Sequence, residues 1–172
     1  MLGYLSATEW GAADLLIRDV AMRLRDDGVT LAGAVQVNLE TGPETKCHMD
    51  LHILDGRDTV RISQDLGALS SGCRLDPDGL ERAVGLVTRA VDNGAALLIV
   101  NKFGKQEIDG HGFRPLIGRV LSDGIPVLTS VNPQHEAAFL EYAADLAERL
   151  PPEVETLTAW CHARIGEASR TG

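Results

Sequence analysis

The stretch AALLIVNKFGKQE, residues 95–107, constrains the fold more than any other part of the chain. Its apolar run Ala96–Val100 is too short to span a membrane and too uniformly apolar for a strand with one face in water. It therefore predicts a central strand that is buried on both faces. Polar and small residues follow from Asn101 to Glu107, at the carboxyl end of this strand. Open α/β sheets bind their ligands at that end, so we expect a binding site there.

Patterns typical of strands and helices alternate on both sides of this run. Further strands are expected at Leu2–Leu5, Thr30–Val37 and Pro126–Val131, with apolar residues at helical spacing between them. Residues 46–62 alternate between apolar and polar and contain an Asp-Gly turn signal, which predicts an antiparallel hairpin. Strands separated by helices indicate right-handed crossovers. We therefore predict a three-layer α/β fold of the P-loop-NTPase-like type, with a mainly parallel sheet and an inserted antiparallel hairpin.

The length of 172 residues is typical of one domain, which we place at residues 1–165.

The pair Asp76-Pro77 predicts the start of a helix that ends before Asn93-Gly94. Residues Ile108–Gly112 are expected to form a loop because they contain two glycines. The last helix is expected at Val154–Ala163, followed by a frayed tail at residues 166–172.

Composition excludes several classes of protein. The chain has 16 basic and 25 acidic residues and a net charge of −9, which argues against general nucleic-acid binding. No apolar run approaches the ~20 residues of a membrane helix, so no membrane interaction is expected. The start lacks the pattern of a signal peptide, and the three cysteines are too few and odd in number for a disulfide framework. A cytoplasmic protein is the expectation.

The loop after the first predicted strand lies where a phosphate-binding P-loop would lie. A P-loop has the spacing GxxxxGK[ST], in which the lysine reaches the outer phosphates and the hydroxyl binds magnesium. Here Ser6 replaces the first glycine and Gly11 keeps the second, while Ala12 and Ala13 occupy the lysine and hydroxyl positions. Two of the three chemical roles of a P-loop are therefore missing.

An anion can still bind at this loop through backbone N–H groups at the start of the helix, because these need no particular side chain. Thr8 and Gly11 are the candidate contacts, and Trp10 is placed to stack on a planar ligand. Glu9 opposes an anion by its charge. The alternative is a purely structural loop, since every α/β protein has such helix starts.

The end of the central strand carries a second set of candidates. Asn101 stands where a nucleotide hydrolase would keep an acid for magnesium. Lys102 and Lys105, with a glycine between them, can bind phosphate or another oxyanion as point charges. The alternative is that they are solvated lysines that neutralise Glu107 and Asp109.

A metal site is a further hypothesis. His48, Asp50 and His52 lie on one face of one predicted strand, and imidazole and carboxylate are ligands for zinc or iron. A fourth ligand would have to come from elsewhere, such as Cys73 or His111. We favour the alternative that this is the water-exposed face of the hairpin, and we interpret Cys73 as a loop residue rather than a nucleophile.

Several motifs carry a resemblance to a known family. The stretches LLIVNKFGKQE, CHMDLHILDGRD, ISQDLG and GCRLDP resemble a bacterial domain family of unknown function, over about Leu2 to Trp160. Members of that family are often encoded near molybdate-transport genes and are sometimes described as nucleoside-triphosphatases. The resemblance implies a molybdate or tungstate link without defining an activity.

A more distant resemblance is to small P-loop nucleoside-triphosphatases whose second motif reads IDEIGxxE. Residues 100–107, VNKFGKQE, are similar in layout, and those enzymes also insert a hairpin after the second strand. Asn101 and Lys102 replace the two acids of the motif, and Ala12 replaces the P-loop lysine, so that only Glu107 survives. The resemblance implies the fold, while the replaced residues argue against ATP hydrolysis.

The sequence leads to one principal function and two alternatives. The first is a ligand-binding or regulatory protein that holds a nucleotide or small oxyanion, with Gly11, Lys102, Lys105, Glu107 and Arg114 as contacts. The second is a weak NTPase or transferase that uses Glu107 as general base. The third is a scaffold that acts through a protein partner or as a homodimer.

Overall fold

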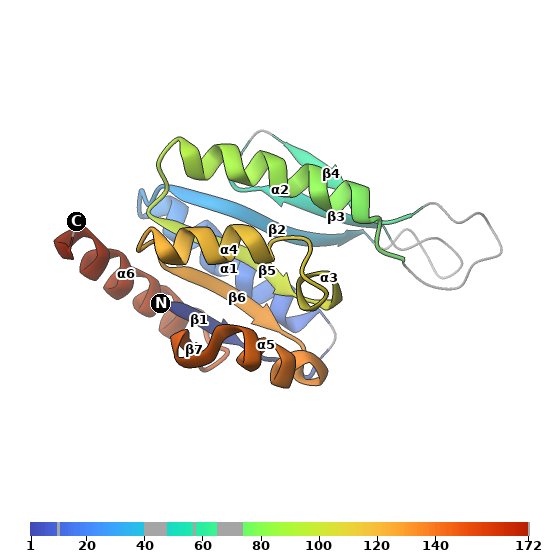
Figure 1. Ribbon diagram of the computed structural model, residues 1–172. Coiled ribbons are helices and arrows are strands. Elements are labelled where there is room, and N and C mark those ends of the chain that lie inside the picture. The colour runs from blue at the N-terminus through green and yellow to red at the C-terminus, as the bar shows by residue number, and fades with distance from the viewer. Residues whose placement is uncertain (10, 40–47, 57, 65–73, 172) are drawn as a thin grey trace.

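A computed structural model of the chain describes residues 1–172 except 10, 40–47, 57, 65–73 and 172 (Figure 1). Within these residues one seven-stranded sheet has the order β4-β3-β2-β5-β6-β1-β7. The strands are β1 (Leu2–Leu5), β2 (Leu31–Leu39), β3 (His48–Ile53), β4 (Thr59–Arg61), β5 (Leu97–Phe103), β6 (Val127–Val131) and β7 (Ala147–Arg149). The pairs β2–β3 and β3–β4 are antiparallel, and the other neighbouring pairs of these strands are parallel. The predicted mainly parallel sheet with an inserted antiparallel hairpin is confirmed.

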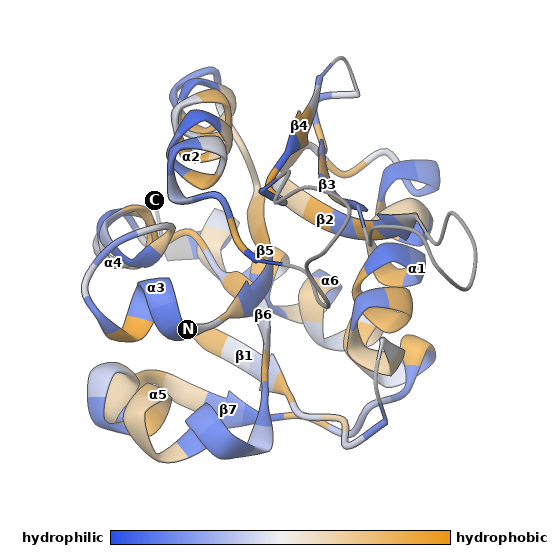
Figure 2. Ribbon diagram, turned by 90° about the vertical axis from the view of Figure 1, so that its right-hand side faces the viewer, coloured by the Kyte–Doolittle hydropathy of each residue, from blue (hydrophilic) through white to orange (hydrophobic). Residues whose placement is uncertain are grey.

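Helices cover both faces of the sheet and complete three layers (Figure 2). One face packs against α1 and α6, and the other packs against α2, α4 and α5. The bounds are α1 (Ala12–Asp26), α2 (Pro77–Asp92), α3 (Lys105–Ile108), α4 (Arg114–Ser122), α5 (Glu136–Ala143) and α6 (Val154–Thr171), with short 3₁₀ turns η1 (Pro133–His135) and η2 (Ala144–Leu146). No helix in the described ranges has the length and hydropathy to cross a membrane.

Strand β5 lies at the centre of the sheet and is buried on both faces, as its apolar run predicts. Leu98 and Val100 belong to the core that includes α2 and α4, whereas Leu97 and Ile99 belong to the core that includes α1 and α6. The strand continues to Phe103, three residues past the end of the apolar run. Its polar end is therefore part of the sheet and is held in extended conformation.

Local sequence signals define several helix ends. Helix α2 begins at Pro77, and the side chain of Asp76 accepts a hydrogen bond from the backbone N–H of Asp78 at 3.1 Å. This side chain satisfies one of the free N–H groups of the first turn. After α1, Gly28 adopts φ 79°, which a glycine tolerates without strain. Helix α2 has the bounds that Asp76-Pro77 and Asn93-Gly94 predict.

Three elements differ from the expectation. Residues Ile108–Gly112 are expected to be a loop, but Ile108 is the last residue of a short helix, α3, that the sequence pattern does not predict. Helix α5 ends at Ala143, and after η2 the chain forms β7 beside β1, a strand that the sequence pattern does not predict. Helix α6 extends to Thr171, past the predicted end at Ala163, so most of the expected frayed tail is helical.

Gly33 provides a test of the packing between β2 and β5. Its φ is +135°, and a Cβ atom there would lie 1.9 Å from the carbonyl oxygen of Ile99. We expect Gly33→Ala to lower the free energy of unfolding by about 3 kcal/mol or more, because backbone must move at the centre of the sheet. The measurement is chemical denaturation of the purified variant.

Gly85→Ala is the matched control. Gly85 is an exposed residue inside α2, and a Cβ atom there meets nothing within 4 Å. This change should raise the free energy of unfolding by about 0.5–1 kcal/mol, since alanine favours the helix. Equal stabilities of the two variants would contradict the close approach of β2 to β5.

Candidate functional site at the carboxyl edge of the sheet

A cavity of about 690 Å³ opens at the carboxyl ends of β1, β5 and β6. It is lined by the loop after β1, the start of α1, the end of β5 and the residues after β6. Of the residues predicted to bind a ligand, four line this cavity: Thr8, Gly11, Lys102 and Lys105. Parallel strands end at the same edge of a sheet, which is why residues far apart in the sequence meet here.

The start of α1 lines the cavity. Gly11 precedes the helix with φ 75°, the backbone N–H of Ala12 donates to the carbonyl of Glu9 at 3.2 Å, and no side chain of the described residues caps the first turn. The leading N–H groups of a helix have no intrahelical partner and carry partial positive charge, which favours an anion. Ala12 and Ala13 supply neither the cation nor the hydroxyl that a P-loop has at these positions.

Asp14 forms hydrogen bonds and an ion pair with several side chains at this edge, although the sequence pattern does not single it out. Its Oδ1 accepts a hydrogen bond from Asn101 Nδ2 at 2.7 Å and lies 3.7 Å from Lys102 Nζ. Its Oδ2 accepts a hydrogen bond from Asn38 Nδ2 at 3.2 Å. The carboxylate is 13% exposed and is thus held by two amides and one ammonium group.

This carboxylate sets the direction of a chain of hydrogen bonds. An ionised carboxylate can only accept, so Asn38 and Asn101 must turn their NH₂ groups toward Asp14. The Oδ1 of Asn38 then accepts from Gln36 Nε2 at 2.8 Å, and the Oδ1 of Asn101 accepts from the Gln36 backbone N–H at 3.0 Å. Gln36 is left with its Oε1 as an acceptor.

Asn101 has a structural role in this arrangement. The residue is 3% exposed, and both ends of its amide are hydrogen-bonded, to Asp14 and to Gln36. Its backbone carbonyl also accepts a hydrogen bond from Ser130 Oγ on β6. The side chain extends the pairing of β2 with β5 and positions Asp14. It does not line the cavity of about 690 Å³.

The two lysines differ in their surroundings. Lys102 is 48% exposed and lies beside Asp14. Lys105 is more exposed, and its Nζ lies 2.9 Å from Asp109 Oδ2 one turn along the chain. This exposed ion pair is weak, and it leaves the Lys105 ammonium group free to exchange Asp109 for a ligand.

Glu107 and Arg114, also predicted as ligand contacts, hold the corner between α3 and α4. Glu107 is 4% exposed, and its carboxylate accepts hydrogen bonds from the backbone N–H groups of Gly104 at 2.9 Å and Phe113 at 3.1 Å. Arg114 Nη1 donates to the carbonyls of Glu107 at 3.2 Å and Ile108 at 3.0 Å. Neither residue lines the cavity of about 690 Å³.

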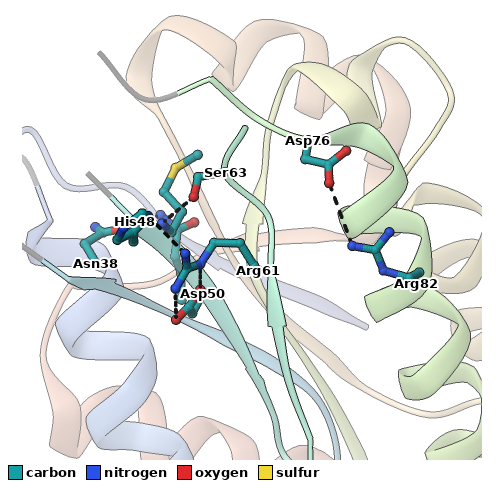
Figure 3. A network of polar contacts seen from close by, with 9 residues as sticks. Asn38, His48, Asp50, Arg61, Ser63, Asp76 and Arg82 are labelled. Atoms are coloured by element: carbon teal, nitrogen blue, oxygen red, sulfur yellow. Dashed lines mark hydrogen bonds and ion pairs between the residues drawn. The ribbon is translucent and has the colours of Figure 1, made fainter. Parts of the chain in front are cut away.

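The hairpin residues considered for a metal site are arranged around an arginine (Figure 3). Arg61 on β4 pairs with Asp50 through Nε and Nη2, and its Nη1 lies 3.0 Å from His48 Nδ1. A guanidinium group in this position repels a metal cation. His52 is exposed, and no group of three or more histidine, cysteine or acidic residues gathers in the described part of the chain. Trp10, Cys47 and Cys73 lie outside the described residues.

The fold is similar to that of a solved structure. The architecture is that of P-loop nucleoside-triphosphatases: the chain aligns with a solved structure titled "Solution Structure of a Human Cancer-Related Nucleoside Triphosphatase". The alignment covers 98% of this chain and 97% of the human one, with a TM-score of 0.66 at 15% sequence identity. It establishes similarity of fold.

Sequence comparison places the chain in a family. It belongs to the family described as "Protein of unknown function (DUF2478)", whose model matches residues 2–160. It is also 32% identical over 148 residues to Molybdenum import ATP-binding protein ModC 2 of *Bradyrhizobium diazoefficiens*. That match covers 86% of this chain and 16% of the relative.

Asn101→Asp tests the network around Asp14. The change replaces a hydrogen bond by two carboxylates in contact, so we expect the free energy of unfolding at pH 7 to fall by about 2–4 kcal/mol. Their repulsion raises the pKa of the pair in the folded state. The loss should therefore shrink as the pH falls toward 4, where the folded pair binds a proton.

Asn132→Asp is the matched control at the same edge. Asn132 Oδ1 accepts a hydrogen bond from the backbone N–H of Gln134 at 2.9 Å, and an aspartate can keep that bond. Chemical denaturation at several pH values compares the two variants. A pH-independent loss in Asn101→Asp would contradict the assigned contact with Asp14.

Glu107 should give the protein a distinct pH dependence. Burial raises the pKa of Glu107, against the opposing effect of the backbone hydrogen bonds from Phe113 and Gly104. Its folded state binds the proton more tightly than the unfolded state, so the resulting stabilisation is complete below the ordinary glutamate pKa. It is lost as the pH rises through the raised value.

The measurement compares wild type with Glu107→Gln between pH 4 and pH 8. We expect the free energy of unfolding of wild type, relative to the variant, to fall as the pH rises. Glu141→Gln, which removes an exposed carboxyl group from α5, serves as the control. A relative stability that rises with pH would contradict the effect of burial.

Proposed function

We propose that this protein binds a nucleotide or a small oxyanion at the carboxyl edge of its sheet and does not hydrolyse it. The supporting observation is that one cavity of about 690 Å³ is lined both by the uncapped start of α1 and by Lys102 and Lys105. Helix N-termini and ammonium groups both favour phosphate and similar anions. The protein would act as a ligand-binding or regulatory protein in the cytoplasm.

The charges at the cavity support an anionic ligand. Asp14 is compensated by Lys102 and by the two amides that donate to it. An incoming anion therefore meets the N–H groups of α1 and the exposed Lys105, with Glu9 as the remaining negative charge on the loop. Displacing Asp109 from Lys105 costs little because that ion pair is exposed.

The side chains argue against hydrolysis. Ala12 and Asn101 stand where hydrolases of this fold carry a lysine and a magnesium-binding acid. Glu107, the acid proposed as a general base in the alternative function, has both carboxylate oxygens engaged by backbone N–H groups and does not line the cavity of about 690 Å³. A general base must reach the attacking water, and the backbone hydrogen bonds occupy both oxygens of this carboxylate.

The relatives favour nucleotides and molybdenum chemistry as ligand classes. The relative that is 32% identical carries "Molybdenum import ATP-binding protein" in its name, although this chain spans 16% of its length. ATP, molybdate and tungstate are therefore the first ligands to test. Molybdate and tungstate are tetrahedral oxyanions, which a helix N-terminus and two lysines suit.

A thermal-shift panel tests this function. The purified protein is heated with ATP, GTP or ADP and magnesium, and separately with phosphate, sulfate, molybdate or tungstate. A ligand at 100 times its Kd adds about 2.7 kcal/mol to the stability of the folded state. We expect a higher melting temperature with one of these ligands, and a much smaller shift in Lys105→Ala.

Arg119→Ala is the control for loss of a surface cation. Arg119 lies on α4, pairs with Asp92 and Asp123, and does not line the cavity. Its ligand-dependent shift should equal that of wild type. Phosphate release from ATP with magnesium should stay at background. No shift with any ligand would exclude the proposed function, and turnover abolished in Glu107→Gln would favour the enzyme.

A further inference from the structure

A second, smaller cavity of about 260 Å³ lies beside the first and is largely apolar. It is enclosed by the ends of β2, β3 and β5, the start of α2 and the α3 corner. Leu51, Leu80, Val100 and Phe113 form its walls, and each of these belongs to the core on the α2 and α4 side. Apolar walls with a few polar groups are typical of sites for small organic molecules.

The two cavities adjoin each other. Gln36, Met49, Lys102, Gly104 and Lys105 line both of them. A ligand held by its anionic group at Lys102 and Lys105 can therefore extend a flat apolar part into the smaller cavity. Phosphate and molybdate have no such part and would leave these apolar walls unused.

Gln36 adds a polar group at the junction. It is 8% exposed, and its NH₂ group is committed to Asn38 in the chain of hydrogen bonds that Asp14 orients. Its Oε1 accepts no hydrogen bond from the part of the chain that the structure describes, which leaves a carbonyl for a ligand. Nucleobases combine a flat apolar face with N–H donors at the edge, and such a donor would satisfy this carbonyl.

We propose that the ligand is a nucleotide whose base occupies the smaller cavity, between β3, β5 and α2, while its phosphates occupy the larger one. This proposal rests on the proposed anion-binding function and narrows its ligand class. The base provides affinity through the apolar walls, and Gln36 orients its edge. The site thereby distinguishes a nucleotide from a bare oxyanion.

The test compares ADP with pyrophosphate, which carries the same kind of anionic group without a base. Isothermal titration calorimetry with magnesium is run on the full chain. The nucleotides ADP, GDP, CDP and UDP are tested in turn. We expect at least one of them to bind at least about tenfold more tightly than pyrophosphate, because the base buries apolar surface.

Two variants fill the smaller cavity, and one matched variant lies outside it. Leu75→Trp and Leu80→Phe enlarge residues of the wall, whereas Leu86→Trp enlarges a half-buried residue of α2 that lines neither cavity. The first two should lower nucleotide affinity to that of pyrophosphate and leave pyrophosphate binding unchanged. Leu86→Trp should bind both ligands as wild type does, and melting curves show that each variant is folded.

The outcomes separate the two proposals. Equal affinity of wild type for pyrophosphate and for all four nucleotides, with both lost in Lys105→Ala, would overturn the assignment of the base and keep the anion site. Nucleotide binding that survives in both folded cavity-filling variants would also overturn it. No binding of any of these probes would exclude the base site and a phosphate-binding function together.

Discussion

The burial of β5 on both faces is the constraint on which the rest of the structure depends. A strand with four consecutive apolar residues needs a helical layer above and below it, and α1 with α6 and α2 with α4 supply these layers. The neighbouring strand must also approach closely, which the missing Cβ atom of Gly33 allows. Where the apolar run ends, the side chain of Asn101 continues the pairing with β2. The first residues of β5 thus lie in the core, and its carboxyl end lies at the polar site.

One carboxylate organises that polar end. Asp14 accepts hydrogen bonds from Asn38 and Asn101, and this fixes the orientation of each amide as far as Gln36. A P-loop centres on a lysine, whereas this site centres on an acid that is neutralised by Lys102. The chain keeps the architecture of P-loop nucleoside-triphosphatases but arranges different chemistry at the same edge.

Part of the candidate site could be predicted because strand ends of a parallel sheet share one edge. Thr8 and Gly11 lie in the loop after β1, Lys102 lies near the end of β5, Lys105 lies just after that strand, and all four line one cavity. Asp14 lies in the first turn of α1, where acidic residues are common in any helix, so its position does not reveal the network. Two polar residues in the apolar strand β2, at positions 36 and 38, were the available signal for the network. Glu107 and Arg114 were chosen for their charges, but both bind the backbone of their own corner, which charge alone does not reveal.

The sequence by itself determined the α/β class, the buried central strand, the hairpin and the ends of α2. These features depend on local hydrogen bonds and on periodic burial, which a single stretch of residues carries. Only the tertiary structure decided the strand order, the short strand β7 and the two adjoining cavities. The residues of β7 have no strand pattern, and they become a strand because Ala147 pairs with Leu2 at the far end of the sequence. Such pairings and cavities arise between distant segments, so their energies are absent from any local stretch of the chain.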